Sequence, residues 1–137
     1  MSASESSEVG LASRLTRQAL FTLGNLSVRW NLTDDDAASI AAIPVMSYLL
    51  RRNGYEHRPL PQEAVHRITA LGLIDRALSR GGSDAAAWVK NPVDDDPFNG
   101  RSPMEVLPRL GLDDLTALNT RMGELVSRPI EYAPPGP

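Results

Sequence analysis

The spacing of apolar residues is the feature that most constrains how this chain folds. In two long runs they recur every three to five positions, as on one face of an α-helix, and no segment alternates convincingly as a β-strand does. The first run is Leu11, Leu15, Leu20, Leu23 and Leu26, and the second is Val65, Ile68, Leu71, Ile74 and Leu78. Because 42% of the 137 residues are apolar, the chain can close one modest core, or two small helical units that share one. We therefore predict an all-α protein.

Residues that start and stop helices divide the chain further. Thr33 can cap a helix that opens with three consecutive acids, which suit the positive end of the helix dipole. Pro61 fits the first turn of the helix that carries the second apolar run, and glycines at 81 and 82 end that helix. Ser83 and Asp84 can then start a short helix, which is followed by a loop over residues 91–100.

The third quarter of the chain ends in a capping-box pattern. Ser102 offers a cap, Pro103 suits the first helical position, and Glu105 stands three residues after the serine. Proline at 108 and glycine at 111 limit this helix to little more than one turn. Asp113 can then cap a longer helix with leucines at 115, 118 and 125.

Several function classes are disfavoured by what the sequence lacks. It has no apolar run of about 18 residues for crossing a bilayer, and its start is polar and acidic, unlike a signal peptide, so we expect a cytoplasmic protein. It has no cysteine, and its two histidines, His57 and His66, have no third ligand nearby, so we expect no metal and no cofactor. Phosphate-binding loops and nucleophile motifs are absent as well, and we expect no enzymatic activity.

Charge is unevenly distributed along the chain. Residues 11–80 carry nine Arg or Lys against six acids, whereas residues 81–137 carry five against nine. A contact with phosphates would therefore be made by the first half, although ordinary surface charge explains the same numbers. Three consecutive acids, Asp94, Asp95 and Asp96, are either solvated or a negative surface for a basic partner.

Residues 33–52 can form a helix-turn-helix. The pattern predicts one helix from Thr33 to about residue 41, a turn over 42–44, and a second helix from residue 45. The second helix would present Ser47 and Tyr48 at its start, with Arg51 and Arg52 at its end, where they could hold DNA phosphates. Any two short helices with a tight turn give this pattern, so a purely structural hairpin is the alternative.

The most specific pattern is Trp88-Val89-Lys90-Asn91-Pro92 followed by Phe98-Asn99-Gly100-Arg101-Ser102-Pro103. It resembles the C-terminal domain of the Xre/MbcA/ParS antitoxin family, over about the last 55 residues. Residues 11–80 more loosely resemble the Xre-type helix-turn-helix domain of that family, including Trp30-Asn31-Leu32-Thr33 and Arg67-Ile68-Thr69. The resemblance implies a disordered segment over 1–10, an Xre-like domain over 11–80, a small helical toxin-binding domain over 81–127 and an extended tail over 128–137.

The physical roles of the motif residues are mainly structural. Gly100 permits a positive-φ turn, and Ser102 and Glu105 can cap the start of a helix. Trp88 and Phe98 supply large apolar side chains for packing. Asn91 and Pro92 end the preceding helix, and Pro103 opens the next one. Arg101 is either an ordinary surface charge or an ion-pair partner for a bound protein.

The resemblance implies a function as the antitoxin of a type II toxin–antitoxin pair. Such a protein neutralises a cognate toxin, commonly a RES-domain protein that consumes NAD, and can autoregulate its operon by binding operator DNA. The alternative is a stand-alone helix-turn-helix regulator whose C-terminal half only dimerises it. Under both functions we expect a homodimer, formed through exposed apolar faces of the 11–28 helix or of the C-terminal helices.

The tail is a candidate toxin contact. From residue 129 it reads as an extended, proline-rich segment, and it combines apolar, aromatic and charged residues. We predict that Arg128, Ile130, Glu131 and Tyr132 bind the toxin, with Ile130 and Tyr132 inserted into its cleft. A tail without a role is the alternative. The acids at 94–96, the proline at 108 and the proline-rich end depart from the family pattern and leave the identity of the toxin open.

Overall fold

A computed structural model describes the backbone of residues 3–127 and the side chains of residues 10–123. The helices are α1 (Ala3–Arg29), α2 (Asp34–Ala41), α3 (Val45–Arg52), α4 (Gln62–Arg80), α5 (Ala85–Lys90), α6 (Pro103–Val106), the 3-10 helix η1 (Leu107–Arg109) and α7 (Leu112–Ser127). Over this described range, the one β-type pairing is an isolated bridge between Val93 and Arg101. The all-α class predicted from the sequence is therefore confirmed.

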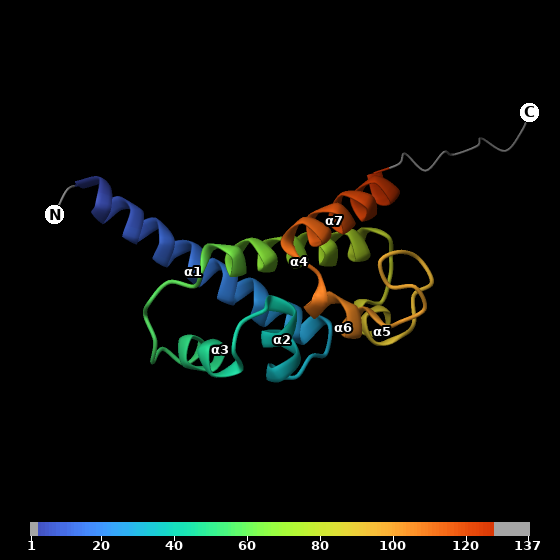
Figure 1. The fold of residues 1–137 in the computed structure, drawn as a ribbon, viewed down its shortest axis with the longest axis horizontal. Helices are drawn as coiled ribbons and strands as arrows, with labels where there is room; N and C mark the ends of the chain where they lie inside the picture. The colour runs from blue at the N-terminus through green and yellow to red at the C-terminus, as the bar shows by residue number, and fades with distance from the viewer. Residues whose placement is uncertain (1–2, 128–137) are drawn as a thin grey trace, which may run out of the picture.

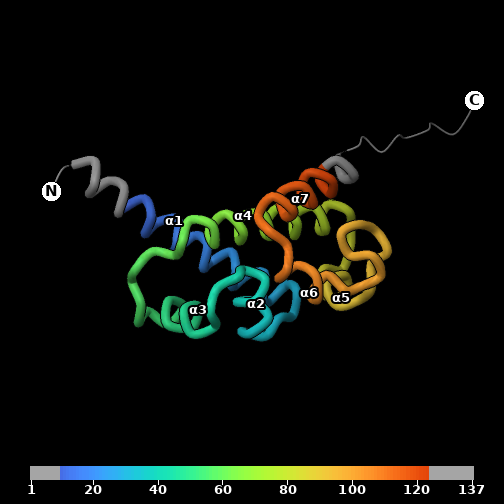
Figure 2. The backbone as a smooth tube through the Cα atoms, viewed as in Figure 1, coloured from blue at the N-terminus to red at the C-terminus, as the bar shows by residue number. Residues whose placement is uncertain are grey.

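Two long helices, α1 and α4, organise the fold. They lie side by side, and α7 packs along α4 (Figures 1 and 2). Helices α2 and α3 pack against α1, and α5 and α6 lie together toward the opposite end of the molecule (Figure 1). Because α4 contacts α1, α2, α5 and α7, it joins the two halves of the chain. Within the described residues, no helix combines the length and apolarity that crossing a bilayer requires.

Polar contacts align α1 with α4. The carboxylate of Asp75 on α4 accepts hydrogen bonds from the Trp30 indole at 2.9 Å and from Arg29 Nε at 2.7 Å. At the other end, the buried hydroxyl of Thr16 accepts a hydrogen bond from the Leu60 amide at 2.9 Å. These bonds satisfy buried polar groups and set how far the two helices can slide along each other.

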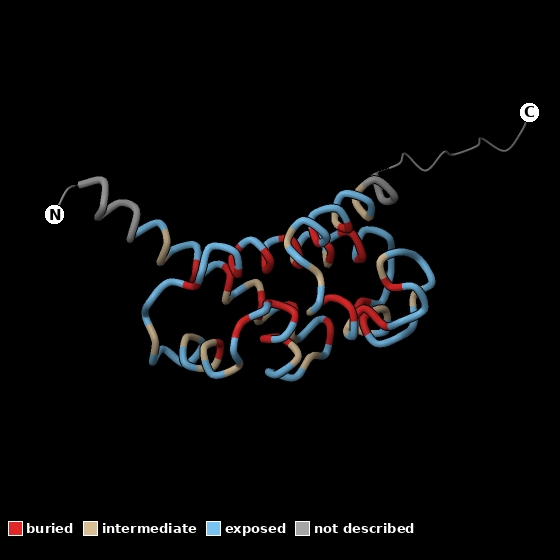
Figure 3. Tube along the Cα trace, viewed as in Figure 1, coloured by how far each residue is buried: buried red, intermediate tan, exposed pale blue. Residues whose placement is uncertain are grey.

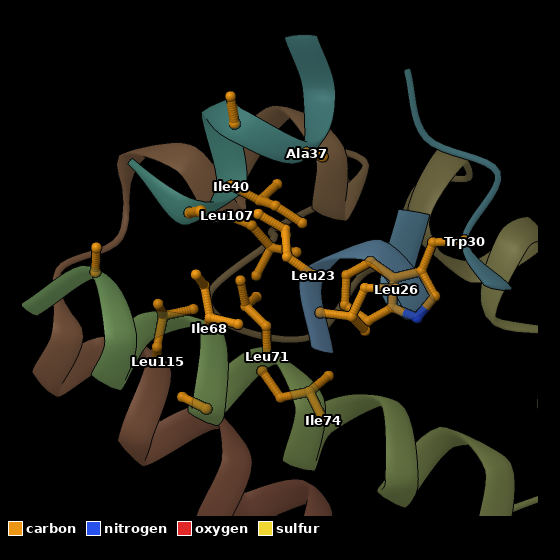
Figure 4. Close-up of a cluster of buried hydrophobic side chains, with 14 of the residues drawn as sticks. Leu23, Leu26, Trp30, Ala37, Ile40, Ile68, Leu71, Ile74, Leu107 and Leu115 are labelled. Atoms are coloured by element: carbon orange, nitrogen blue, oxygen red, sulfur yellow. The ribbon is translucent and has the colours of Figure 1, made fainter. Parts of the chain in front are cut away.

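One hydrophobic core spans the whole fold. Side chains from α1, α2, α4, η1 and α7 meet in it (Figure 4), and the buried positions are spread along all of these elements (Figure 3). The second apolar run is buried at every position, whereas in the first run only Leu23 and Leu26 are buried, and Leu11 and Leu15 are exposed. The core continues across residue 80, where the sequence suggested a boundary between two domains.

The predicted helix starts are partly confirmed. Thr33 caps α2 by accepting a hydrogen bond from the Asp36 amide, and Asp84 caps α5 by accepting from two amides. Ser102 occupies the cap position of α6, but its side chain makes no capping bond, so the predicted capping box does not form. The Ser102 side chain is instead buried, and Glu105 is exposed. The assignment of Asp113 as a cap was wrong, because α7 already begins at Leu112.

The start of the chain differs from the prediction. We expected residues 1–10 to be disordered, but α1 begins at Ala3, so the helix includes most of this segment. The two acids of this segment suit the positive end of a helix dipole, which favours a helix that starts here.

Candidate partner-binding surfaces

The segment predicted as a helix-turn-helix forms two eight-residue helices. Helices α2 and α3 are separated by residues 42–44, in agreement with the predicted bounds. The turn is tight because Ala42 adopts a left-handed conformation, with φ at 58°. Its amide donates to the carbonyls of Ala38 and Ser39 at the end of α2. The bounds of the two helices were predictable from the sequence, because a cap residue marks the start of α2 and a proline marks the start of α3.

Tyr48 does not lie on the surface where the sequence placed it. We predicted that α3 would present Tyr48 to DNA, but only 1% of this residue is exposed. Helix α3 packs against α1 and α2, and its one aromatic side chain is the part that enters the core. Ser47 is half-buried and is hydrogen-bonded to Arg51.

Both arginines of α3 have partners inside the protein. Arg51 donates from Nε to the Arg58 carbonyl at 3.0 Å and also to the carbonyl and hydroxyl of Ser47. Arg52 forms an ion pair with Asp34 at 2.5 Å, and its guanidinium lies 5.3 Å from the centre of the Tyr48 ring. The hydrogen bond to Asp34, followed by that to Tyr48, raises the pKa of Arg52. Binding a phosphate would therefore require these arginines to give up existing bonds.

The outer surface of the α2–α3 hairpin carries several exposed apolar side chains and little unpaired positive charge. Met46 is 60% exposed, and Leu50 and the nearby Tyr55 are exposed as well. Residues 34–58 carry four acids against three arginines. Proteins that bind DNA need positive charge to displace counterions and polar side chains to reach base edges. The exposed arginines of this segment, Arg52 and Arg58, are already paired with Asp34 and Glu56, so its surface is better suited to a protein than to a duplex.

The motif in the second half forms one packed unit. The Trp88 ring makes edge-to-face contacts with Phe98, at a centroid distance of 5.6 Å, and with Trp30, at 5.9 Å. Gly100 has a φ of 87°, which confirms the positive-φ turn predicted for it. The turn aligns Val93 with Arg101 in the isolated bridge. Phe98 of the loop over residues 91–100 thus packs on Trp88 of α5, which in turn packs on Trp30, directly after α1.

Asn91 and Pro103 take the structural positions that the sequence predicted for them. Asn91 is the C-cap of α5, and its side-chain amide donates to the Ala87 carbonyl at 2.8 Å. Pro103 occupies the first turn of α6. Arg101 is exposed, and its side chain makes no hydrogen bond or ion pair with the part of the chain that the structure describes. It is therefore free to contact a partner. Arg128, Ile130, Glu131 and Tyr132 lie outside the described residues.

Arg67, which the sequence associated with the family resemblance only, has a structural role in the core. It is 3% exposed, and its guanidinium donates to the carbonyls of Ile40, Leu107 and Leu110. Its Nε has no partner, and burial lowers its pKa. Position 67 is three residues after a buried alanine and four before Leu71, so the helical period could have placed it on the core side.

A groove lies between α1 and α4. It has a volume of about 1040 Å³ and is lined by side chains of both helices. Phe21 is 71% exposed and Val28 is 82% exposed, and Leu73 faces them from α4. The sequence predicted an exposed apolar face on the 11–28 helix, and these residues form one. The participation of α4 was not predictable, because it depends on how the two helices pack.

No group of acidic, histidine or cysteine side chains in the described residues could hold a metal ion. No protein-family model matches this chain, and no curated protein or solved structure is significantly similar to it.

Proposed function

We propose that this protein is the antitoxin of a type II toxin–antitoxin pair, and that it acts by binding a protein toxin. The observation that carries the proposal is the contact between the two segments that resemble the Xre/MbcA/ParS family. Trp30, from the first segment, packs edge-to-face on Trp88, from the second, and Trp88 packs on Phe98. Residues that resemble the family in separate parts of the sequence thus meet in space.

The surface chemistry supports a protein partner over DNA. The α2–α3 hairpin exposes apolar and acidic side chains, and both arginines of α3 are already bonded to other groups of the protein. A stand-alone DNA-binding regulator is therefore the less favoured function. Autoregulation by operator binding stays a prediction from the resemblance.

The resemblance implies that the toxin is a RES-domain protein that consumes NAD, and that the C-terminal region blocks its active site. In this proposal Arg101 pairs with an acidic group of the toxin, because it is exposed and has no partner among the described residues. The tail over residues 128–137 supplies the inserted segment, with Ile130 and Tyr132 as its apolar contacts.

The proposal is tested by co-expressing the full chain with the protein encoded by the neighbouring gene. We expect a complex that survives purification, restored growth, and an NAD pool that is preserved in cells with both proteins but depleted in cells with the neighbour alone. A toxic neighbour that depletes NAD whether or not this chain is present would contradict the proposal.

Variants then locate the contact. Ending the chain at Ser127 should abolish protection while leaving the helical circular-dichroism spectrum unchanged. Arg101→Ala should weaken the complex, whereas Arg109→Ala, which removes an exposed arginine from η1, should not. Equal effects of the two arginine variants would refute the assigned role of Arg101. The double variant Arg51→Ala with Arg52→Ala should leave toxin binding intact. If the chain binds no toxin and this double variant abolishes DNA binding as its only activity, the DNA-binding regulator is favoured instead.

A further inference from the structure

The arginines of the first half fall into two groups. Five of them, Arg29, Arg51, Arg52, Arg58 and Arg67, are hydrogen-bonded to other groups of the protein. The other four, Arg14, Arg17, Arg76 and Arg80, make no hydrogen bond or ion pair within the described residues. All four line the α1–α4 groove or the smaller hollow that adjoins it along α1. The unpaired arginines of the first half are thus gathered along this groove.

The groove has almost no compensating negative charge. Asp75 is the one acid among its lining residues, and this carboxylate already accepts hydrogen bonds from Arg29 and Trp30. Between the arginines lie exposed apolar side chains, namely Leu15, Phe21, Val28 and Leu73. A ligand that fits this surface must bring both negative charge and an apolar face.

We propose that the α1–α4 groove binds an amphipathic helix of a partner protein, one whose apolar stripe is flanked by acidic residues. An apolar helix face laid in a groove is a recurring mode of protein recognition, and the acids would pair with arginines that have no other partner. The proposal rests on the proposed antitoxin function for the identity of the partner, because the toxin is the protein expected to supply the helix. It adds a contact surface separate from Arg101 and the tail.

A second copy of the chain fits this groove poorly. A two-fold interface brings the same patch of both copies together, so unpaired arginines would face unpaired arginines. Nucleic acid would neutralise the charge but would leave Val28 and Leu73 without an apolar partner. The expected homodimer, if formed, should therefore use another face.

The groove is tested with the purified full chain and synthetic helical peptides of about 18 residues, long enough for roughly five turns. The first peptide has a leucine stripe flanked by glutamates, the second replaces the glutamates with lysines, and the third keeps the composition of the first but scrambles the stripe. We expect the first peptide to bind, with an affinity that falls as salt is raised, and at least tenfold tighter than the other two. Equal binding of the first and third peptides would overturn the proposal.

Variants of the chain then place the peptide. Arg76→Gln with Arg80→Gln should weaken binding of the acidic peptide about tenfold. Phe21→Gln, which removes an exposed aromatic side chain, should weaken it to a similar degree. Lys90→Gln with Arg109→Gln removes two exposed basic residues outside the groove and should change the affinity less than about twofold. Equal effects of the groove and control variants would overturn the assignment.

Two further measurements decide between occupants. The first is the molecular mass in solution. If the wild-type chain is a dimer and the Phe21→Gln variant is a monomer, a second copy occupies the groove and the proposal is overturned. Tight binding of an oligonucleotide that the Arg76 and Arg80 variant abolishes would overturn it as well. In the co-expressed complex, Phe21→Gln should speed dissociation of the toxin. If the wild-type complex forms but this variant binds as tightly, the groove inference fails while the antitoxin function stands.

Discussion

Replacing Arg67 with methionine tests how the two halves of the chain are held together. The change removes a guanidinium that donates to three backbone carbonyls, and it leaves an apolar side chain of similar length. The hydrogen bonds to Ile40 and Leu107, at 2.9 and 3.1 Å, are buried, so water cannot easily replace the lost donor. Backbone carbonyls cannot be exchanged for apolar groups. In the variant the Ile40 carbonyl loses this buried donor, whereas the Leu107 carbonyl keeps the hydrogen bond from the Leu110 amide at 3.2 Å.

The expected loss of stability follows from these bonds. A hydrogen bond to a charged group contributes roughly 1.5–3 kcal/mol, and two buried ones are lost. Part of this loss is offset, because the variant no longer buries a charged guanidinium. The same desolvation lowers the pKa of Arg67. We therefore expect the free energy of unfolding to fall by about 2–4 kcal/mol. Since a chain of 137 residues commonly has about 7–20 kcal/mol of stability, the variant should still fold.

Urea unfolding followed by circular dichroism measures the effect. With a slope of about 2 kcal/mol per molar urea, the midpoint should fall by about 1–2 M. Arg76→Met is the matched control, because this arginine is nine positions along the same helix, is exposed, and should lose less than about 0.5 kcal/mol. Arg67→Lys should fall between the two, since an ammonium cannot reach all three carbonyls. An Arg67→Met variant as stable as the control would refute the reasoning.

Three further predictions concern local features of the fold. Asp84→Ala should lower stability by about 1 kcal/mol in thermal unfolding because it removes a cap that accepts from two amides, and Ser102→Ala, which removes no capping bond, should cost less; the reverse order would contradict the assigned caps. The hydrogen bond from Arg58 lowers the pKa of Glu56 to about 2, so this bond should persist above pH 4.5 and be lost as the pH falls toward 2. NMR titration of the Glu56 carboxyl carbon checks this, and Arg58→Gln should return the midpoint toward 4.5; an unchanged midpoint would argue against the pairing. Gly24→Ala, within α1, should raise stability by roughly 0.5–1 kcal/mol, because alanine favours a helix and the added methyl group meets no atom of another element within 4 Å. Thermal unfolding measures this, and a lower melting temperature would contradict it.

The sequence alone predicted the helices and most of their bounds. Apolar residues at helical spacing, proline and glycine at the ends of helices, and the cap at Thr33 act over three or four positions, so they can be read without knowing the fold. The positive-φ turn at Gly100 was predictable for the same reason, since it depends on the backbone of one residue. Local chemistry was thus a sufficient guide to local structure.

What each surface presents was decided by the tertiary structure. The sequence placed Tyr48 on an exposed face and gave Arg67 no structural role, but packing of α3 and α4 buried both. The groove has the same origin, because its arginines come from two helices separated by residues 30–61 and meet only when α1 lies against α4. Burial and charge pairing depend on distances between elements, and those distances exist only once the common core has formed.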